Sequence, residues 1–133
     1  MAALHNPALL AGRLMLAFIF IIEGGMKITH YEAVVGYMQG YGVPGALLPL
    51  VILTELGGGL LVALGLFTWL AALALAGFAL LTALFFHLDF SNPDQVIQIY
   101  KNIAIAGGFV VLAAVGPGAI SLDRRRNRPV VKG

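Results

Sequence analysis

Three ionisable residues, Arg13, Glu23 and Lys27, lie within one long apolar stretch, residues 8–28. A charged side chain at the centre of a membrane-spanning helix costs about 2.5 to 3.5 kcal/mol, so each of them needs a partner or water. A helix advances about 100° per residue, which brings all three side chains onto one face. We therefore expect this face to point into the protein or into water rather than into lipid.

A single acidic residue, Glu55, lies near the middle of the next apolar stretch, residues 46–66. Gly58, Gly59 and Ala63 follow it on the same helical face. Small residues allow helices to approach closely in lipid, so the carboxylate is expected at an interface with another helix.

The polar residues of the four apolar stretches fall into two sets by their depth along the helices. Arg13 and Glu55 are expected to form a buried ion pair across the interface between the first two spans. The second set lies toward the other ends of the first, third and fourth spans. Its members are expected to line one polar pocket that opens to the outer side: Glu23, Lys27, His87, Lys101 and Asn102.

These charges have a functional and a structural interpretation. Acids and cations inside lipid mark pathways for substrates, protons or ions, but buried pairs also neutralise each other and fix helix register. Both interpretations stay open for Glu23 and Lys27, which are i, i+4 neighbours in one helix. The structural interpretation is favoured for Arg13 with Glu55. The functional one is favoured for Lys101, which has no acidic residue within four positions.

Composition places the whole chain in a membrane. Of its 133 residues, 60% are hydrophobic and 11% charged, which is too apolar for an ordinary soluble domain. The chain has no cysteine, so thiol redox chemistry, disulfides and iron–sulfur clusters cannot come from it alone. We expect a single domain, with the N-terminal stretch kept as the first span rather than cleaved as a signal peptide.

The pattern predicts an all-α membrane protein, a four-transmembrane-helix bundle with spans at about 7–27, 46–66, 69–87 and 93–115. Asn6 and Asn92 precede prolines and are expected to be helix N-caps. The sequence T-x-x-E from Thr29 to Glu32 is a capping box. It predicts a short helix between spans one and two, lying at the membrane surface, with a plain loop as the alternative.

The basic residues are concentrated at the C-terminus, where residues 119–133 are expected to form a cytoplasmic tail. By the positive-inside rule both termini are then cytoplasmic. Contact with anionic lipid explains this tail better than binding of nucleic acid. Five of the chain's eight basic residues lie in its last ten positions: Arg124, Arg125, Arg126, Arg128 and Lys132.

No established motif for metal or phosphate binding is present. His5, His30 and His87 show no i, i+3 or i, i+4 spacing, so neither a metal site nor a haem is expected within one chain. We expect no covalently bound cofactor.

Several motifs together resemble the DoxX family of small four-span bacterial membrane proteins, over about residues 11–123. They are R-x-x-x-A-x-I-F-I-x-E-G-G-x-K-I from Arg13, G-V-P-G from Gly42 and E-L-G-G-G-L-L-V-A-L-G from Glu55, followed by F-H at His87, K-N at Lys101, and G-P-G with S-L-D at the end of the match. The family is similar to DoxD, a membrane subunit of a thiosulfate:quinone oxidoreductase. The resemblance implies a bacterial inner-membrane component of a quinone-linked oxidoreductase system.

The residues and the resemblance leave three alternative functions, each from a different class. In the first, the pocket binds a quinone headgroup, the lysines stabilise negative charge on oxygen, and Glu23 or His87 moves protons. The second is transport of a proton or small solute through the same charges. The third is a structural subunit without activity of its own, which associates with other membrane or redox subunits, or with itself, in the lipid bilayer.

Overall fold

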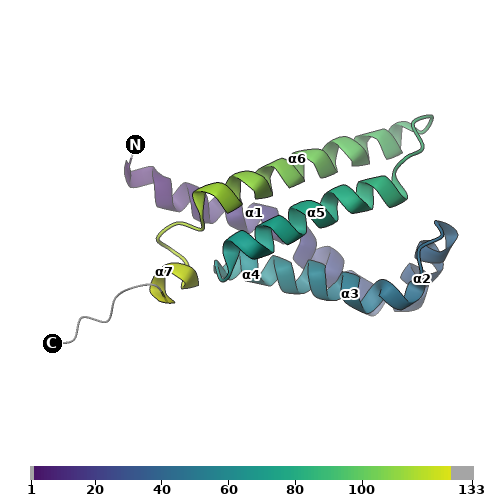
Figure 1. Cartoon of the computed structure of the whole chain (residues 1–133), viewed down its shortest axis with the longest axis horizontal. Helices are drawn as coiled ribbons and strands as arrows, with labels where there is room; N and C mark the ends of the chain where they lie inside the picture. Colours follow the sequence, from purple (N-terminus) through teal and green to yellow (C-terminus); the bar gives the residue numbers. More distant parts are fainter. Residues whose placement is uncertain (1, 127–133) are drawn as a thin grey trace.

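The computed structural model describes residues 2–126 of the chain (Figure 1). Every regular element in this part is helical. The elements are α1 (Ala2–Thr29), α2 (Tyr31–Gly40), the 3-10 turn η1 (Gly45–Leu47), α3 (Leu48–Ile52), the π-helical segment η2 (Leu53–Gly57), α4 (Gly58–Leu64), α5 (Thr68–Phe86), α6 (Pro93–Val115) and α7 (Leu122–Arg126).

Within residues 2–126, four helical segments are long and apolar enough to cross a membrane, which confirms the predicted four-span, all-α fold. They are Leu4–Thr29, Gly45–Leu64, Thr68–Phe86 and Pro93–Val115. The second span is continuous through η1, α3, η2 and α4. Successive spans alternate in direction, so the turn at residues 65–67 and α7 lie at one end of the bundle, while α2 and the loop 87–92 lie at the other (Figure 1). We call these the α7 end and the α2 end.

The first helix begins earlier than predicted. It starts at Ala2 and continues through Pro7, so Asn6 is not its N-cap. Instead Asn6 Oδ1 accepts a hydrogen bond of 2.9 Å from the backbone N–H of Ala119. Pro7 is the sixth residue of α1, beyond its first turn, so the helix lacks the one backbone hydrogen bond that an N–H at this position would donate.

The short helix between spans one and two is present as α2, but it does not begin with the predicted capping box. Thr29 is still part of α1, and its hydroxyl donates to the carbonyl oxygen of Met26 at 2.9 Å. His30 precedes α2 without any side-chain capping bond. The prediction for α6 is confirmed, because Asn92 Oδ1 accepts from the backbone N–H of Asp94 at 3.0 Å, with Pro93 as the first helical residue.

Two glycines bring α1 against the second span. A Cβ on Gly24 would lie 2.7 Å from the backbone nitrogen of Leu56, and one on Gly59 would lie 3.0 Å from Cγ1 of Ile21. Side chains at these positions would force the helices apart, as is usual for small residues at membrane helix interfaces. The contacts fix the register of the two helices, with the Gly24 turn of α1 level with η2.

The hydrophobic core lies between the middle of the bundle and the α7 end. Its fully buried side chains come from each of the four spans: Ala17, Val62, Leu75 and Phe109. Phe20 packs edge-on against Phe109, with ring centroids 5.4 Å apart. The spans are therefore packed tightly in this half.

The segment after α6 is attached to the α7 end by Asp123. Its carboxylate accepts hydrogen bonds from the backbone N–H groups of Phe67 and Thr68, both at 2.9 Å, and from the Thr68 hydroxyl at 2.8 Å. These are the unpaired donors at the start of α5, so a residue 55 positions away along the chain from Thr68 caps this helix. Arg126 lies over the ring of Phe67, with its Cζ 4.5 Å from the ring centroid.

Candidate functional site

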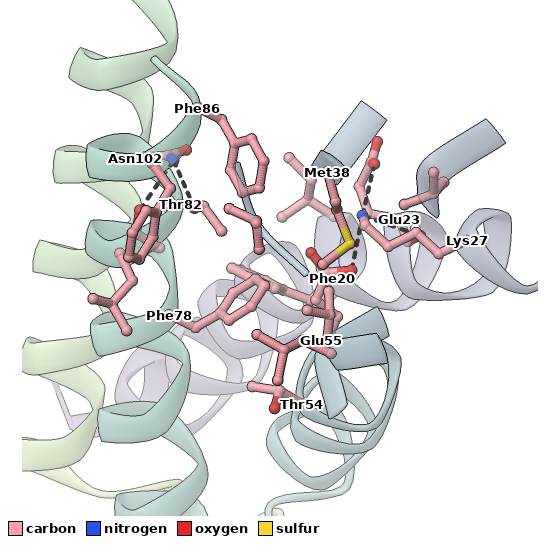
Figure 2. Close-up of a pocket in the computed structure, with 18 of the residues that line it drawn as sticks. Phe20, Glu23, Lys27, Met38, Thr54, Glu55, Phe78, Thr82, Phe86 and Asn102 are labelled. Carbon is pink, nitrogen blue, oxygen red and sulfur yellow. Dashed lines mark hydrogen bonds and ion pairs between the residues drawn. The ribbon is translucent and has the colours of Figure 1, made fainter. Parts of the chain in front are cut away.

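A pocket of about 960 Å³ occupies the α2 half of the bundle (Figure 2). One side is formed by α1, α2, α3 and η2, and the other by α5 from Leu73 onward and by the first half of α6. Its walls are mostly aliphatic and aromatic, with a few charged and polar side chains. All five residues that the sequence places in a common pocket line it: Glu23, Lys27, His87, Lys101 and Asn102.

Lys27 joins two carboxylates on one wall of this pocket. Its Nζ lies 2.8 Å from Oε2 of Glu55 and 3.4 Å from Oε2 of Glu23. The contact with Glu55 is an ion pair by distance, but its angles are not those of a hydrogen bond. The Glu55 side chain is 8% exposed, that of Lys27 19% and that of Glu23 53%. The three groups thus lead from a buried acid through a cation to an exposed acid.

Glu55 lies in the π-helical segment η2. A single turn of π-helix interrupts the regular backbone bonding and is frequent at functional sites. The neighbouring glycine positions keep the carboxylate close to α1 on one side and α5 on the other, since a Cβ on Gly58 would lie 3.1 Å from the Leu75 side chain. The expectation that Glu55 faces other helices agrees with this geometry.

The expected ion pair between Arg13 and Glu55 is wrong. Arg13 is buried, 2% exposed, but it lies at the α7 end, where Nη1 donates to the carbonyl oxygen of Pro117 at 2.6 Å and Nη2 to that of Ile120 at 2.9 Å. The helix register explains the difference. Arg13 is level with Gly65, ten residues and roughly 15 Å along the second span from Glu55.

Asn102 lines the opposite side of the pocket and is 8% exposed. Its amide nitrogen donates to the carbonyl oxygen of Ala79 at 3.0 Å and to Thr82 Oγ1 at 3.1 Å. These bonds join α6 to α5. Within residues 2–126 the Asn102 Oδ1 atom receives no hydrogen bond, so it is the polar atom of this wall with acceptor capacity to spare.

His87 and Lys101 line the pocket on the same side as Asn102 but are more exposed than Asn102. The Nδ1 atom of half-buried His87 is 2.6 Å from Oε1 of Gln95, a hydrogen bond that orients the imidazole ring. Lys101 is exposed and forms no ion pair with any residue in the described part of the chain. Both side chains can therefore change partners without breaking an internal ion pair.

Aromatic side chains form a large share of the walls, and sequence reasoning did not place them there. Phe20 and Phe78 lie between the charged wall and Asn102 (Figure 2), with ring centroids 6.4 Å apart. Phe86 stacks on Tyr37 of α2, with ring centroids 5.5 Å apart, and this pair joins α5 to α2 at the α2 end of the pocket. Phenylalanines in an apolar span give no periodic signal that separates a pocket wall from the core.

Thr82 was also missed, although its side chain is the only polar one between Trp69 and His87 in the sequence. That isolation was a usable signal. In the structure the Thr82 hydroxyl donates to the carbonyl oxygen of Ala79 at 2.9 Å and accepts from Asn102. It therefore orients the amide that lines the pocket.

The arrangement can bind a flat, mostly apolar group that carries oxygen atoms. The rings supply stacking surfaces, Lys27 and Lys101 supply cations, and Glu23, Glu55 and His87 can exchange protons. No group of three or more His, Cys, Asp or Glu side chains that could hold a metal ion occurs among the residues described.

Four apolar spans around an intramembrane pocket define a multi-pass α-helical membrane protein with a candidate small-molecule site. The chain belongs to the DoxX family, whose family model matches residues 8–88.

Two curated relatives from Escherichia coli K12 are similar over almost the whole chain. Inner membrane protein YqjF is 45% identical over 128 residues, which cover 96% of this chain and 98% of the relative. Inner membrane protein YphA is 38% identical over 125 residues, covering 88% of this chain and 89% of the relative. Both names agree with the expected inner-membrane location. No solved structure matches the chain.

Proposed function

We propose that this protein is a component of a quinone-linked membrane oxidoreductase system, and that the pocket at the α2 end binds the quinone headgroup. One observation carries the proposal: the ammonium group of Lys27 is held against two carboxylates in the wall of an otherwise apolar, aromatic pocket. A pocket of about 960 Å³ is within the range of sites for drug-sized ligands, which combine apolar walls with a few polar groups.

The residues present fit such a headgroup. Lys27 and Lys101 would donate to its oxygen atoms and stabilise negative charge there, and the free Oδ1 of Asn102 would accept from a hydroxyl. A bound quinone would supply the capacity to take up two electrons and two protons. Glu55 and Glu23 flank Lys27, so they would pass protons between the pocket and its exposed rim. Electrons would come from a redox partner, not from this chain.

Calorimetric titration of the purified protein in lipid nanodiscs tests this proposal. The probe is a dimethoxy-methyl benzoquinone with a ten-carbon chain. Wild type should bind it, and Lys101→Met should lower the affinity about tenfold, equivalent to about 1.4 kcal/mol. Because Lys101 is exposed and unpaired in the described structure, this substitution tests binding without disturbing the fold. Arg125→Met, at the α7 end, is the matched control and should bind like wild type. Absence of binding by wild type would overturn the proposal.

Transport of a proton or small solute is the second candidate, favoured by the buried carboxylate of Glu55. The core opposes it, because Ala17, Val62 and Phe109 fill the bundle between the pocket and the α7 end. Transport would require these side chains to separate. Uptake into proteoliposomes that is lost in Glu55→Gln would favour this function over quinone binding.

We also propose that the pocket opens to the outer side of the membrane. Arg124, Arg125 and Arg126 lie at the α7 end, opposite the pocket, and basic residues favour the cytoplasmic side. Arg128 and Lys132, the rest of the predicted basic tail, lie outside the described residues. The chain lacks cysteine, so Ser91→Cys should react with an impermeant maleimide from outside the cell, whereas protection of this cysteine would reverse the topology.

A further inference from the structure

Exposed residues in the pocket wall indicate an opening on the side of the bundle, between the second span and α5. Leu50 on one side and Leu73 and Leu81 on the other all line the pocket, yet they are 60%, 46% and 53% exposed. Residues that are both exposed and in the pocket wall form its rim. Figure 1 shows α5 diverging from α3 toward the α2 end.

This side opening lies at the depth of the hydrocarbon layer. Gly77, which also lines the pocket, is the central residue of α5, with nine residues of the helix on either side. At the standard rise this is roughly 14 Å from each end of the helix, near the middle of a hydrocarbon layer about 30 Å thick. Only hydrocarbon chains can pass through the opening at this depth, because water and lipid headgroups are excluded from the hydrocarbon layer.

Gly77 forms a notch in the rim. It lies between Leu73 and Leu81 at i, i+4 and i+8, so the two leucines flank an empty position on one helical face. A Cβ on Gly77 would have no atom within 4 Å. Gly58 differs, because its Cβ would lie 3.1 Å from Leu75. Gly77 is thus a small residue that no helix in the described part of the chain packs against, in a position where alanine would favour the helix.

We propose that the ligand of this pocket has a hydrocarbon chain, that the chain lies in the notch at Gly77, and that the ligand enters sideways from the bilayer. The polar wall supports this orientation, because the ion pair of Lys27 with Glu55 lies inside the pocket while Leu50, Leu73 and Leu81 make the rim of the side opening aliphatic. A headgroup held at the charges leaves its chain directed to the opening. This inference rests on the proposed function, which places the headgroup. It adds the binding site of the ligand's hydrocarbon chain, here called the chain seat, and the route by which the ligand enters.

Two probes and two glycine variants separate the seat from the headgroup site. The probes are the benzoquinone with a ten-carbon chain and the same ring without a chain, each titrated into nanodiscs. Gly77→Leu fills the notch, and Gly107→Leu is the matched control, because Gly107 on α6 is also exposed, has no atom within 4 Å of a Cβ and lies outside the pocket. Ala74→Phe, one turn away on the same rim, repeats the test with another side chain.

Gly77→Leu and Ala74→Phe should weaken binding of the chain-bearing probe at least tenfold, while the chainless ring binds as to wild type. Gly107→Leu should bind both probes normally. If both rim variants bind the chain-bearing probe like wild type, the side seat is wrong and the headgroup site stands. If wild type binds neither probe, the proposed function fails and the chain seat with it. If Gly77→Leu instead separates a dimer into monomers with unchanged affinities, the notch holds a second copy of the chain and the inference is overturned.

Discussion

Nζ of Lys27, near the end of α1, lies 2.8 Å from Oε2 of Glu55 in the middle of the second span. Through this contact the ammonium group of Lys27 pairs with a buried carboxylate of a neighbouring helix. The proposed headgroup site and the proposed chain seat both depend on it.

Substitution of Gly24 should disturb this contact without touching either charge. Gly24→Ala would place a Cβ 2.7 Å from the backbone nitrogen of Leu56, and backbone cannot move aside as a flexible side chain can. We expect the free energy of unfolding to fall by about 1 to 3 kcal/mol, measured by thermal unfolding in detergent. Gly25→Ala is the neighbouring control, because its Cβ meets nothing within 4 Å. It should be neutral or stabilise the helix by up to about 1 kcal/mol. Equal effects of the two substitutions would contradict the close approach of α1 to η2.

Arg13 should act as a structural clamp at the α7 end. Arg13→Met removes both donors from the carbonyl groups of Pro117 and Ile120, and we expect a loss of about 3 kcal/mol, since charged buried hydrogen bonds contribute about 1.5 to 3 kcal/mol each and do not add fully. Arg13→Lys should recover part of this loss, because one ammonium replaces a two-pronged guanidinium.

The same variant should expose the segment that Arg13 holds. Trypsin should cleave at Arg124 to Arg126 faster in Arg13→Met than in wild type, because Pro117 and Ile120 lose their hydrogen bonds to α1 while the bond from Ala119 to Asn6 remains. Arg125→Met, an exposed arginine at the same end, should change stability by less than about 0.5 kcal/mol. Unchanged cleavage and stability in Arg13→Met would contradict the clamp.

Asp123 should make stability depend on pH in the acid range. Burial alone would raise its pKa, but hydrogen bonds from Thr68 and Phe67, together with the charge of Arg126, outweigh burial and lower it. A carboxyl group with a lower pKa in the folded than in the unfolded state stabilises the protein above the unfolded value of about 3.9. That stabilisation is lost as the pH falls through the folded value.

The corresponding variant, Asp123→Ala, should lower the free energy of unfolding by about 1 kcal/mol at neutral pH, the usual effect of losing a helix cap. The difference from wild type should shrink at pH values below the lowered pKa, in thermal unfolding curves recorded across the acid range. Glu32→Gln, an exposed acid at the start of α2, should show no such change. A constant difference at all pH values would mean that the carboxylate charge has no part in the cap.

The sequence was sufficient for the four spans and for five polar residues of the pocket wall, because isolated polar side chains in apolar segments have few alternatives to the bundle interior. These five are Glu23, Lys27, His87, Lys101 and Asn102. It assigned the wrong partner to Glu55. The choice between Arg13 and Lys27 depends on helix register, which Gly24 and Gly59 fix through contacts with Leu56 and Ile21. Such contacts between helices are not encoded in the periodicity of either one.

The caps show the same limit. Asn92 binds a backbone donor two residues away, which local sequence can indicate, and that prediction is confirmed. Asn6 binds Ala119 and Asp123 binds Phe67 and Thr68. Those partners lie far along the chain, so only the fold identifies them.

A double-mutant cycle on unfolding free energy, with Lys27→Met and Glu55→Gln, tests the central contact most directly. A buried charge that loses its partner costs about 3 kcal/mol or more, so we expect Lys27→Met alone to destabilise strongly and the double variant to recover much of the loss. The predicted coupling is at least about 2 kcal/mol, while the parallel cycle of Arg13→Met with Glu55→Gln should give less than about 0.5 kcal/mol. Negligible coupling in the first cycle, or strong coupling in the second, would contradict the ion pair on which the pocket is built.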